Sequence, residues 1–441
     1  MTKQRDFKAL VRERMAKTGE RYAAARARVI RETSTQGQSP QLRPRLYPGV
    51  LDGYDAFGGI QSGTAPVTNV LRHAGATWSA TGAPFTESTV NGLCGGAGFL
   101  YAVFEYKGWP PLLSIALQSR SMPDAYIGGG LARLGVKTTK SETTSAGAAR
   151  KVLDATLGAG KPALCTTGLR TVAVVGRDGD DHWVDGRAPV PTRLPSERLA
   201  RLRGGYKATK NRLVSIDESD PSADALATLR HAIAETATSY VEPPVPKSFQ
   251  VNCGFAGLEK WQRMLTDRKD RKAWPTLFAE GPRAFAALKR TYEWVACFVA
   301  PGAGRPLYAE FLDDAARILA QPALRTSASA FRDAGQRWSD LASFIATIDD
   351  AAVRRACEAA EHAIEALDDE GDCHTVEDPM ELAQKQRVAG LDCTLTKEAA
   401  LAIYAEMATR VGAIAEAERA AVVEMAAIGR AVTGRSAPRR T

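Results

Sequence analysis

Two polar residues in the first half of the sequence, Ser62 and Asp185, are of types that could act together in nucleophilic catalysis. Residues 60–75 predict a turn followed by a helix, which places Ser62 near a helix N-terminus, where the helix dipole favours negative charge. A serine hydroxyl attacks only when an adjacent general base removes its proton. His73 would lie roughly 16 Å away, at about 1.5 Å per helical residue. We therefore weigh a nucleophilic Ser62 against a helix-capping or turn serine, and the second interpretation is favoured.

The segment that contains Asp185 predicts a β-hairpin. Thr171–Gly176 is a short, β-branched apolar strand, and His182–Asp185 resumes the strand pattern after a polar turn. Arg170 opens the first strand, and its guanidinium, with a pKa above ~12, cannot accept a proton at neutral pH. His182 would point away from Asp185, because residues three apart in a strand face opposite sides. The hairpin therefore presents an acid with no neighbouring base.

A glycine-rich block at residues 84–106 holds two further candidates, Glu87 and Cys94. Glu87 falls at the start of a helical run. The block has neither the Gly-Lys-Ser/Thr ending nor the register of a phosphate-binding loop, so its glycines indicate close packing. Cys94, and Cys165 on a predicted strand, are alternative nucleophiles, although buried and inert thiols are the favoured interpretation.

A second group of residues could suggest a metal site in the C-terminal half, namely Cys357, His362, Cys373, His374 and Cys393. Their spacings match no zinc-binding pattern, and acidic residues typical of a solvated loop surround them. We therefore predict no metal and no cofactor.

The composition is typical of a globular protein with more than one domain. Of the 441 residues, 44% are hydrophobic and 24% are charged. No stretch approaches the ~18 apolar residues that span a membrane, and the charged N-terminus lacks the apolar core of a signal peptide. The seven cysteines are scattered without a CxxC pair, which predicts reduced thiols and a cytoplasmic location.

The net charge of +8 is concentrated at the N-terminus, where residues 1–33 hold ten basic and four acidic residues. Apolar residues at helical spacing on both sides of Lys17–Gly19 predict a helical hairpin over residues 5–31. This basic arm would pack on its own protein or on an acidic partner, or it would bind nucleic acid through phosphate contacts. The lack of interleaved aromatic residues for base stacking disfavours nucleic acid.

The pattern as a whole predicts an α+β protein. Its expected segments are the basic hairpin, a linker, a mixed α/β domain, a bridging helix with a proline-rich linker, and a helical domain, at residues 1–33, 34–48, 49–218, 219–248 and 249–441. In the last predicted helix, residues 396–432, apolar residues recur every three or four positions. Such a stripe predicts a bundle core or a seam between two copies of the chain.

Several motifs resemble a known family. Pro84–Tyr106 (PFTES…GLCGGAGFLY), Trp109–Pro111 and the hairpin VAVVGRDGD…VDGRAPVP resemble the N-terminal domain of butirosin biosynthesis protein H. Phe249–Phe344, with GFAGLEKWQRMLTD and RPLYAEFLDDAA, resembles the helical domain of unknown function that is fused to it. Together these resemblances cover most of residues 50–345.

The resemblance implies a papain-like fold and an acyltransferase-like protein of antibiotic biosynthesis, which moves an aminoacyl group from a carrier-protein thioester to an amine. An acyl carrier protein and a small-molecule amine are the partners it implies. In the family pattern a cysteine is the nucleophile and a histidine opening the hairpin is the base. These positions fall on Ser62 or Gly63 and on Arg170 or Thr171, whereas the acid Asp185 and the helix-start Glu87 are retained.

Three functions follow as hypotheses. The loss of both reactive residues favours a cleft repurposed to bind a ligand or partner. The alternative is an enzyme that transfers an acyl or amide group with altered residues around Ser62, Glu87, Cys94, Cys165 and Asp185. The third is a nucleic-acid-associated protein that acts through the basic arm.

Overall fold

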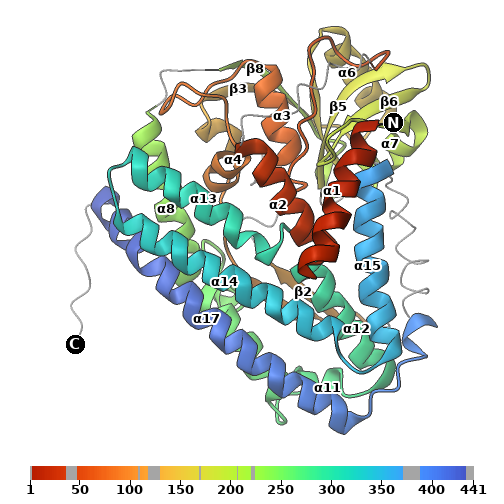
Figure 1. Ribbon diagram of the computed structural model, residues 1–441, viewed down its shortest axis with the longest axis vertical. Helices are drawn as coiled ribbons and strands as arrows, with labels where there is room; N and C mark the ends of the chain where they lie inside the picture. The colour runs from red at the N-terminus through yellow and green to blue at the C-terminus, as the bar shows by residue number, and fades with distance from the viewer. Residues whose placement is uncertain are drawn as a thin grey trace. The chain divides into compact units, whose positions relative to one another are not determined.

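The chain divides into two compact units, each built from segments distant in sequence. Unit 1 holds residues 1–94, 122–225 and 363–376, and unit 2 holds residues 95–121, 226–362 and 377–441. The computed structural model describes residues 2–35, 47–107, 110–117, 130–167, 170–205, 207–219, 224–370 and 388–433 (Figure 1). Trp109, most of the predicted linker 34–48, and Cys373 and His374 lie outside these ranges. The predicted α+β class, with a helical C-terminal region, is confirmed.

Unit 1 begins with two antiparallel helices, α1 (Thr2–Thr18) and α2 (Tyr22–Thr35). They pack through a small apolar cluster in which Val11 and Val29 are buried. Gly19 lies between them with a φ of 69°, a left-handed conformation that glycine adopts without strain. The helical hairpin expected at the N-terminus is therefore present.

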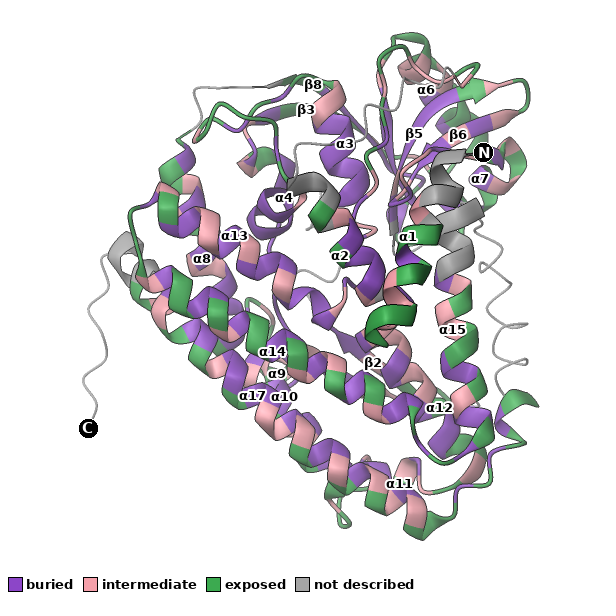
Figure 2. Ribbon diagram, in the orientation of Figure 1, coloured by how far each residue is buried: buried purple, intermediate pink, exposed green. Residues whose placement is uncertain are grey.

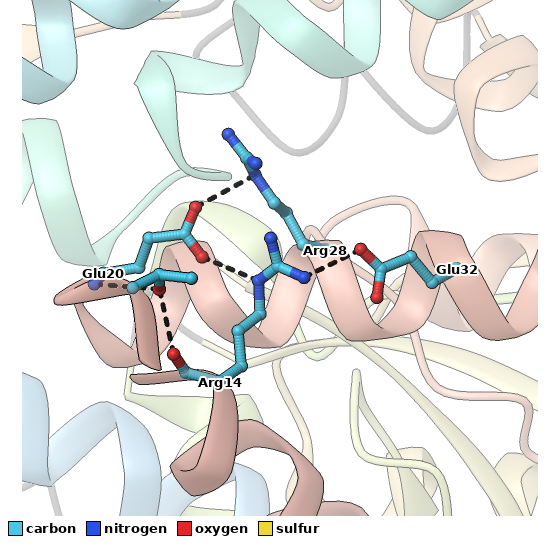
Figure 3. A network of polar contacts seen from close by, with 5 residues as sticks. Arg14, Glu20, Arg28 and Glu32 are labelled. Atoms are coloured by element: carbon cyan, nitrogen blue, oxygen red, sulfur yellow. Dashed lines mark hydrogen bonds and ion pairs between the residues drawn. The ribbon is translucent and has the colours of Figure 1, made fainter. Parts of the chain in front are cut away.

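Some of the cations of this helical hairpin form ion pairs within it (Figure 3). The Arg14 guanidinium donates to Glu20 at 2.7 Å and to Glu32 at 2.8 Å. Arg28 pairs with the other carboxylate oxygen of Glu20 at 3.1 Å. Lys17 pairs with Glu13 at 2.6 Å.

A six-stranded antiparallel sheet forms the centre of unit 1, in the order β3-β8-β4-β5-β6-β7. Its strands are β3 (Val136–Ser141), β4 (Ala163–Thr167), β5 (Arg170–Asp178), β6 (Asp181–Asp185), β7 (Thr192–Pro195) and β8 (Leu213–Ser219). The three helices that pack against this sheet or beside it are α3 (Ala65–His73), α6 (Ala146–Gly158) and α7 (Ser196–Gly204).

The two faces of this sheet carry different sets of side chains. Cys165, Val174 and Val184 pack with Leu153 of α6 and Leu199 of α7 in one apolar core. Because side chains alternate along a strand, their neighbours in sequence point to the opposite face. That second face carries Asp185 and lies against α3, which packs on β4 and β5.

The predicted hairpin is formed by β5 and β6, joined through Gly179 and Asp180. Both strands extend further toward the turn than the apolar pattern indicated, because Arg177 pairs with His182. At Gly176 the segment around Gly49 approaches so closely that a Cβ would lie 2.0 Å from the Gly49 carbonyl oxygen. Only glycine fits at this position.

Unit 2 combines a two-stranded hairpin with a set of helices. The hairpin consists of β1 (Leu100–Phe104) and β2 (Leu112–Ala116). The longer helices are α8 (Ala225–Val241), α10 (Gly254–Thr266), α12 (Gly281–Tyr292), α13 (Arg305–Ile318), α14 (Ala323–Ala346), α15 (Ala351–Glu370, of which residues 351–362 belong to this unit) and α17 (Lys397–Thr433). Among the described helices, none is long and apolar enough to cross a membrane.

The apolar stripe predicted for the last helix lies on α17 and is used inside unit 2 (Figure 2). Met407, Val411, Ile414 and Met425 are fully buried, and α17 packs against α10 and α14. Of the two structures that the stripe predicted, these contacts correspond to the bundle core.

A fully buried arginine, Arg305, lies at the centre of unit 2. Its Nε donates to the buried carboxylate of Glu418 at 2.7 Å, and a second nitrogen donates to the Gly98 carbonyl at 2.7 Å. The Tyr240 hydroxyl accepts at 3.0 Å, and the Trp338 indole donates to Glu418 at 2.7 Å. One guanidinium thus links α13 to α8, to α17 and to the segment before β1.

Removing this guanidinium should strongly destabilise the protein. We expect Arg305→Met to lower the free energy of unfolding by about 3–5 kcal/mol, because it leaves the Glu418 carboxylate buried without its cation. Chemical denaturation monitored by tryptophan fluorescence measures the change. The double variant Arg305→Met/Glu418→Gln, which also removes the stranded charge, should recover a large part of the loss. Unchanged stability of the single variant would contradict the prediction.

Candidate functional site

The acid predicted from the hairpin, Asp185, is fully buried at the end of β6. Its Oδ2 accepts hydrogen bonds from the Tyr54 hydroxyl and, at 2.9 Å, from the Asn69 side-chain amide. Within the described residues, Oδ1 has no hydrogen-bond partner. Burial raises the pKa of Asp185 to about 7, although the two hydrogen bonds oppose this rise. The acid is therefore held by a phenol and an amide.

Strand register explains why Asp185 faces α3. Asp185 lies opposite Ala173 in the β5–β6 pair, so these two side chains share one face. Thr171, two residues before Ala173, also lies on this face and is buried. Arg170 opens β5, as predicted. Its side chain lies outside the described part of the chain.

Ser62 lies half-buried in the turn immediately before α3. Glu87, the first residue of α4 (Glu87–Leu93), holds this turn from a neighbouring helix. Its carboxylate accepts from the backbone N–H groups of Ile60 and Gln61, each at 2.8 Å, and from the Thr64 hydroxyl at 3.0 Å. Burial raises the pKa of Glu87, whereas these three donors lower it. Glu87 thus fixes the conformation of the turn.

A residue of the N-terminal helical hairpin also holds this region. Arg26 of α2 is buried, and its guanidinium donates to the carbonyl of Gly59 at 2.6 Å and to that of Arg187 at 2.5 Å. Gly59 in turn donates its N–H to the Arg187 carbonyl at 3.0 Å. Arg26 therefore links the segment before Ser62 to the loop after Asp185.

Two buried amides complete the surroundings of the turn. The Asn91 side chain of α4 donates to the Gln61 side-chain oxygen at 2.8 Å. Gln61 immediately precedes Ser62, so this bond orients the residue next to the candidate nucleophile. Asn69 and Asn91 were not predicted as site residues. A signal for Asn69 was present, because a buried polar side chain inside an apolar helix face needs a partner.

The histidines do not supply a base to either candidate residue. His182 points into the opposite face of the sheet, where its Nδ1 lies 2.9 Å from the Ser196 hydroxyl. The ring of His73 lies against Tyr54, with centroids 5.2 Å apart. Among the described residues, no histidine hydrogen-bonds to Ser62 or Asp185.

The two candidate thiols lie apart from Asp185. Cys165 is fully buried in the apolar core on the α6–α7 face of the sheet, and burial raises the pKa of its thiol. Cys94 is buried at the C-terminal end of α4, where Gly130 packs so closely that a Cβ would lie 2.0 Å from its Sγ. The environment of Cys165 therefore disfavours the reactive thiolate.

Among the described contacts of Ser62 and Asp185, no group accepts a proton from the Ser62 hydroxyl. Ser62 is at the N-terminal turn of α3, and Asp185 lies beside the middle of the same helix through Asn69. Within the described residues, the backbone N–H groups of Ser62 and Gly63 have no acceptor, so this turn could bind an anionic or carbonyl oxygen.

Replacement of Asp185 by asparagine should change how stability depends on pH. A carboxyl whose pKa rises from 3.8 to about 7 on folding binds its proton more tightly in the folded state. The stability it contributes is therefore present at low pH and is lost as the pH rises through 7. Relative to that of Asp185→Asn, the free energy of unfolding of wild type should increase by about 1.4 kcal/mol per pH unit as the pH falls from 7 to 5. Denaturant unfolding at several pH values measures this difference, and a pH-independent difference would contradict it.

Replacement of Arg26 should loosen the two segments that it joins. Arg26→Lys keeps the charge but loses one of two carbonyl contacts, so amide hydrogen exchange in residues 58–64 and 186–189 should accelerate about tenfold. Mass spectrometry of exchanged peptides measures this. Arg28→Lys, on the exposed side of the same helix, is the control and should change exchange less than twofold. Equal acceleration in both variants would exclude the linking role.

Two protein-family models match separate parts of the chain. Residues 61–173 match the model of butirosin biosynthesis protein H, N-terminal, and residues 198–376 match a domain of unknown function, DUF4872. The first match contains Ser62, Glu87, Cys94, Cys165 and Arg170, and ends before Asp185. No curated protein resembles the chain closely enough to be matched to it. The chain therefore carries an N-terminal domain of the butirosin biosynthesis protein H type, fused to a C-terminal domain of unknown function.

Proposed function

We propose that residues 49–218 form a papain-like domain of an acyl- or aminoacyl-transferase-like protein of specialised metabolism, and that residues 249–441 form the helical domain. The N-terminal family match and the placement of α3 against an antiparallel sheet support this proposal. In such a domain a helix carries the nucleophile at its N-terminus and the sheet carries the acid. The position of Ser62 in the turn before α3 and that of Asp185 at the end of β6 support this proposal.

The function that we propose for this domain is binding of a ligand or partner, without acyl transfer. One observation carries the proposal: Asp185 is held by Tyr54 and Asn69, where an orienting acid would hold a histidine. Burial and the neighbouring carboxylate hold the pKa of Tyr54 well above its usual value, so its hydroxyl stays a donor and does not act as a base. Without a base, the Ser62 hydroxyl is a weak nucleophile.

An active enzyme with altered residues is the second candidate. Its support is the half-buried Ser62 hydroxyl beside backbone N–H groups that have no acceptor among the described residues. Such groups could stabilise the oxyanion of a tetrahedral intermediate. In this case a substrate amine would have to lose its proton to a group outside the described contacts of Ser62.

The partners and location implied by this function remain proposals. An acyl carrier protein and a small-molecule amine fit the family resemblance, and a cytoplasmic location fits the scattered thiols. Self-association through the C-terminal helices is also proposed, although the α17 stripe already packs inside unit 2. Nucleic-acid binding through the N-terminal helices has less support, because Arg26 is buried and Arg14 is paired with two carboxylates.

Acyl transfer to the protein provides the test. Wild type is incubated with acyl and aminoacyl thioesters of N-acetylcysteamine, and intact-protein mass spectrometry looks for an adduct. We expect no adduct on wild type, because Ser62 has no base. We expect the variant Ser62→Cys to be acylated, because its thiol is far more nucleophilic at the same helix N-terminus.

Ser62→Ala is the matched control for both measurements. An adduct on wild type that maps to Ser62 and disappears in Ser62→Ala would overturn the binding proposal and establish the enzyme. An adduct that persists in Ser62→Ala would instead identify another residue, such as Cys94.

A further inference from the structure

An exposed group of basic residues lies in unit 2, around the connection between α10 and the short helix α11 (Trp274–Leu277). Here residues 260–272 contain six cations and two carboxylates. We call this group the basic loop, defined by Lys260, Arg263, Arg268, Lys269, Arg271 and Lys272. We propose that the basic loop is a docking surface for a carboxylate-rich protein partner.

Four cations of the basic loop are fully available to a partner. Arg263, Arg268, Lys269 and Arg271 are exposed. Within the described part of the chain, none of the four forms an ion pair. This differs from α1 and α2, where Arg14, Lys17 and Arg28 are paired with neighbouring glutamates. Part of the charge that the sequence concentrates at the N-terminus is therefore paired, whereas these four cations of the basic loop form no ion pair among the described residues.

The two carboxylates of the loop accept hydrogen bonds from its own backbone N–H groups, and among the described residues they form no ion pair with the four exposed cations. Asp267 accepts from the backbone N–H groups of Lys269 at 2.7 Å and Asp270 at 3.0 Å. Asp270 accepts from the N–H of Lys272 at 2.8 Å, and its carbonyl accepts from the Thr276 hydroxyl at 3.3 Å. The loop is thereby pre-organised, which reduces the entropy lost when a partner binds.

At each end of the loop, a partly buried lysine is held in place by a polar contact. Lys260 donates to the side-chain oxygen of Asn252 at 2.7 Å, and Lys272 pairs with Glu105 at 3.3 Å. Burial lowers the pKa of Lys260, and Arg263 and Lys272 lower it further. Asp270 opposes this lowering.

The chemistry of the loop fits carboxylates better than a nucleic acid. Three of its exposed cations are arginines, whose planar guanidinium binds carboxylates with two parallel hydrogen bonds. Residues 262–273 contain no aromatic side chain on which a base could stack. We therefore assign the surface to an acidic protein.

The proposal is tested on the full chain with two labelled probes, a 20-residue poly-glutamate peptide and a 20-base-pair DNA duplex. Fluorescence anisotropy gives Kd over a salt series, for wild type and for the triple variant Arg268→Glu/Lys269→Glu/Arg271→Glu. We expect the variant to bind poly-glutamate at least tenfold more weakly, with a shallower dependence on salt. Carbodiimide cross-linking should join a probe carboxylate to Lys269 of wild type.

The matched control reverses three exposed cations elsewhere in unit 2, Arg283, Arg325 and Lys397. It should change Kd by less than twofold, and thermal unfolding should show both variants folded. Absence of poly-glutamate binding at low salt, or an equal loss in the control, would overturn the proposal. If wild type binds the DNA more tightly than poly-glutamate, and the triple variant binds the DNA at least tenfold more weakly, the partner would be a nucleic acid and not an acidic protein. None of these readouts depends on acyl transfer, so they stand apart from the test of Ser62.

Discussion

The cost of burying a charge shapes both units of this protein. Such a charge is tolerated only when hydrogen-bond partners replace the water that it loses. Arg305 meets this requirement with Glu418, Tyr240 and backbone carbonyls, and so connects the helices of unit 2. In unit 1, Arg26 meets it with the carbonyls of Gly59 and Arg187. These partners come from distant parts of the sequence, so each buried charge fixes how those parts meet.

The same constraint determines the chemistry of the candidate site. The Glu87 carboxylate is used to hold the turn that carries Ser62, and so it is not available as a base for that residue. Asp185 receives a phenol and an amide on one oxygen. Glu87 and Asp185, the two acids that the family resemblance retains, therefore both accept hydrogen bonds from uncharged donors.

Sequence patterns located most regular elements well. The period of 3.6 residues marked α17 within a few residues of its observed ends, and the β-branched apolar run before a polar turn marked the β5–β6 hairpin. Alternation also predicted that His182 and Asp185 face opposite sides, which the register confirms. Charge counting was less informative, because it gave the N-terminal helices the largest excess of cations without indicating that Arg14 and Arg28 are neutralised by Glu20.

By itself, the sequence determined the α+β class, the helix periods and the family. The tertiary structure alone decided that Tyr54 and Asn69, 131 and 116 residues from Asp185, are its partners. It also decided that Arg26 reaches Arg187 across 161 residues. The physical reason is that local patterns follow from backbone geometry, which repeats every two or 3.6 residues. The partner of a buried polar group depends on which distant segments of the chain the fold brings into contact, and a local sequence period contains no information about that.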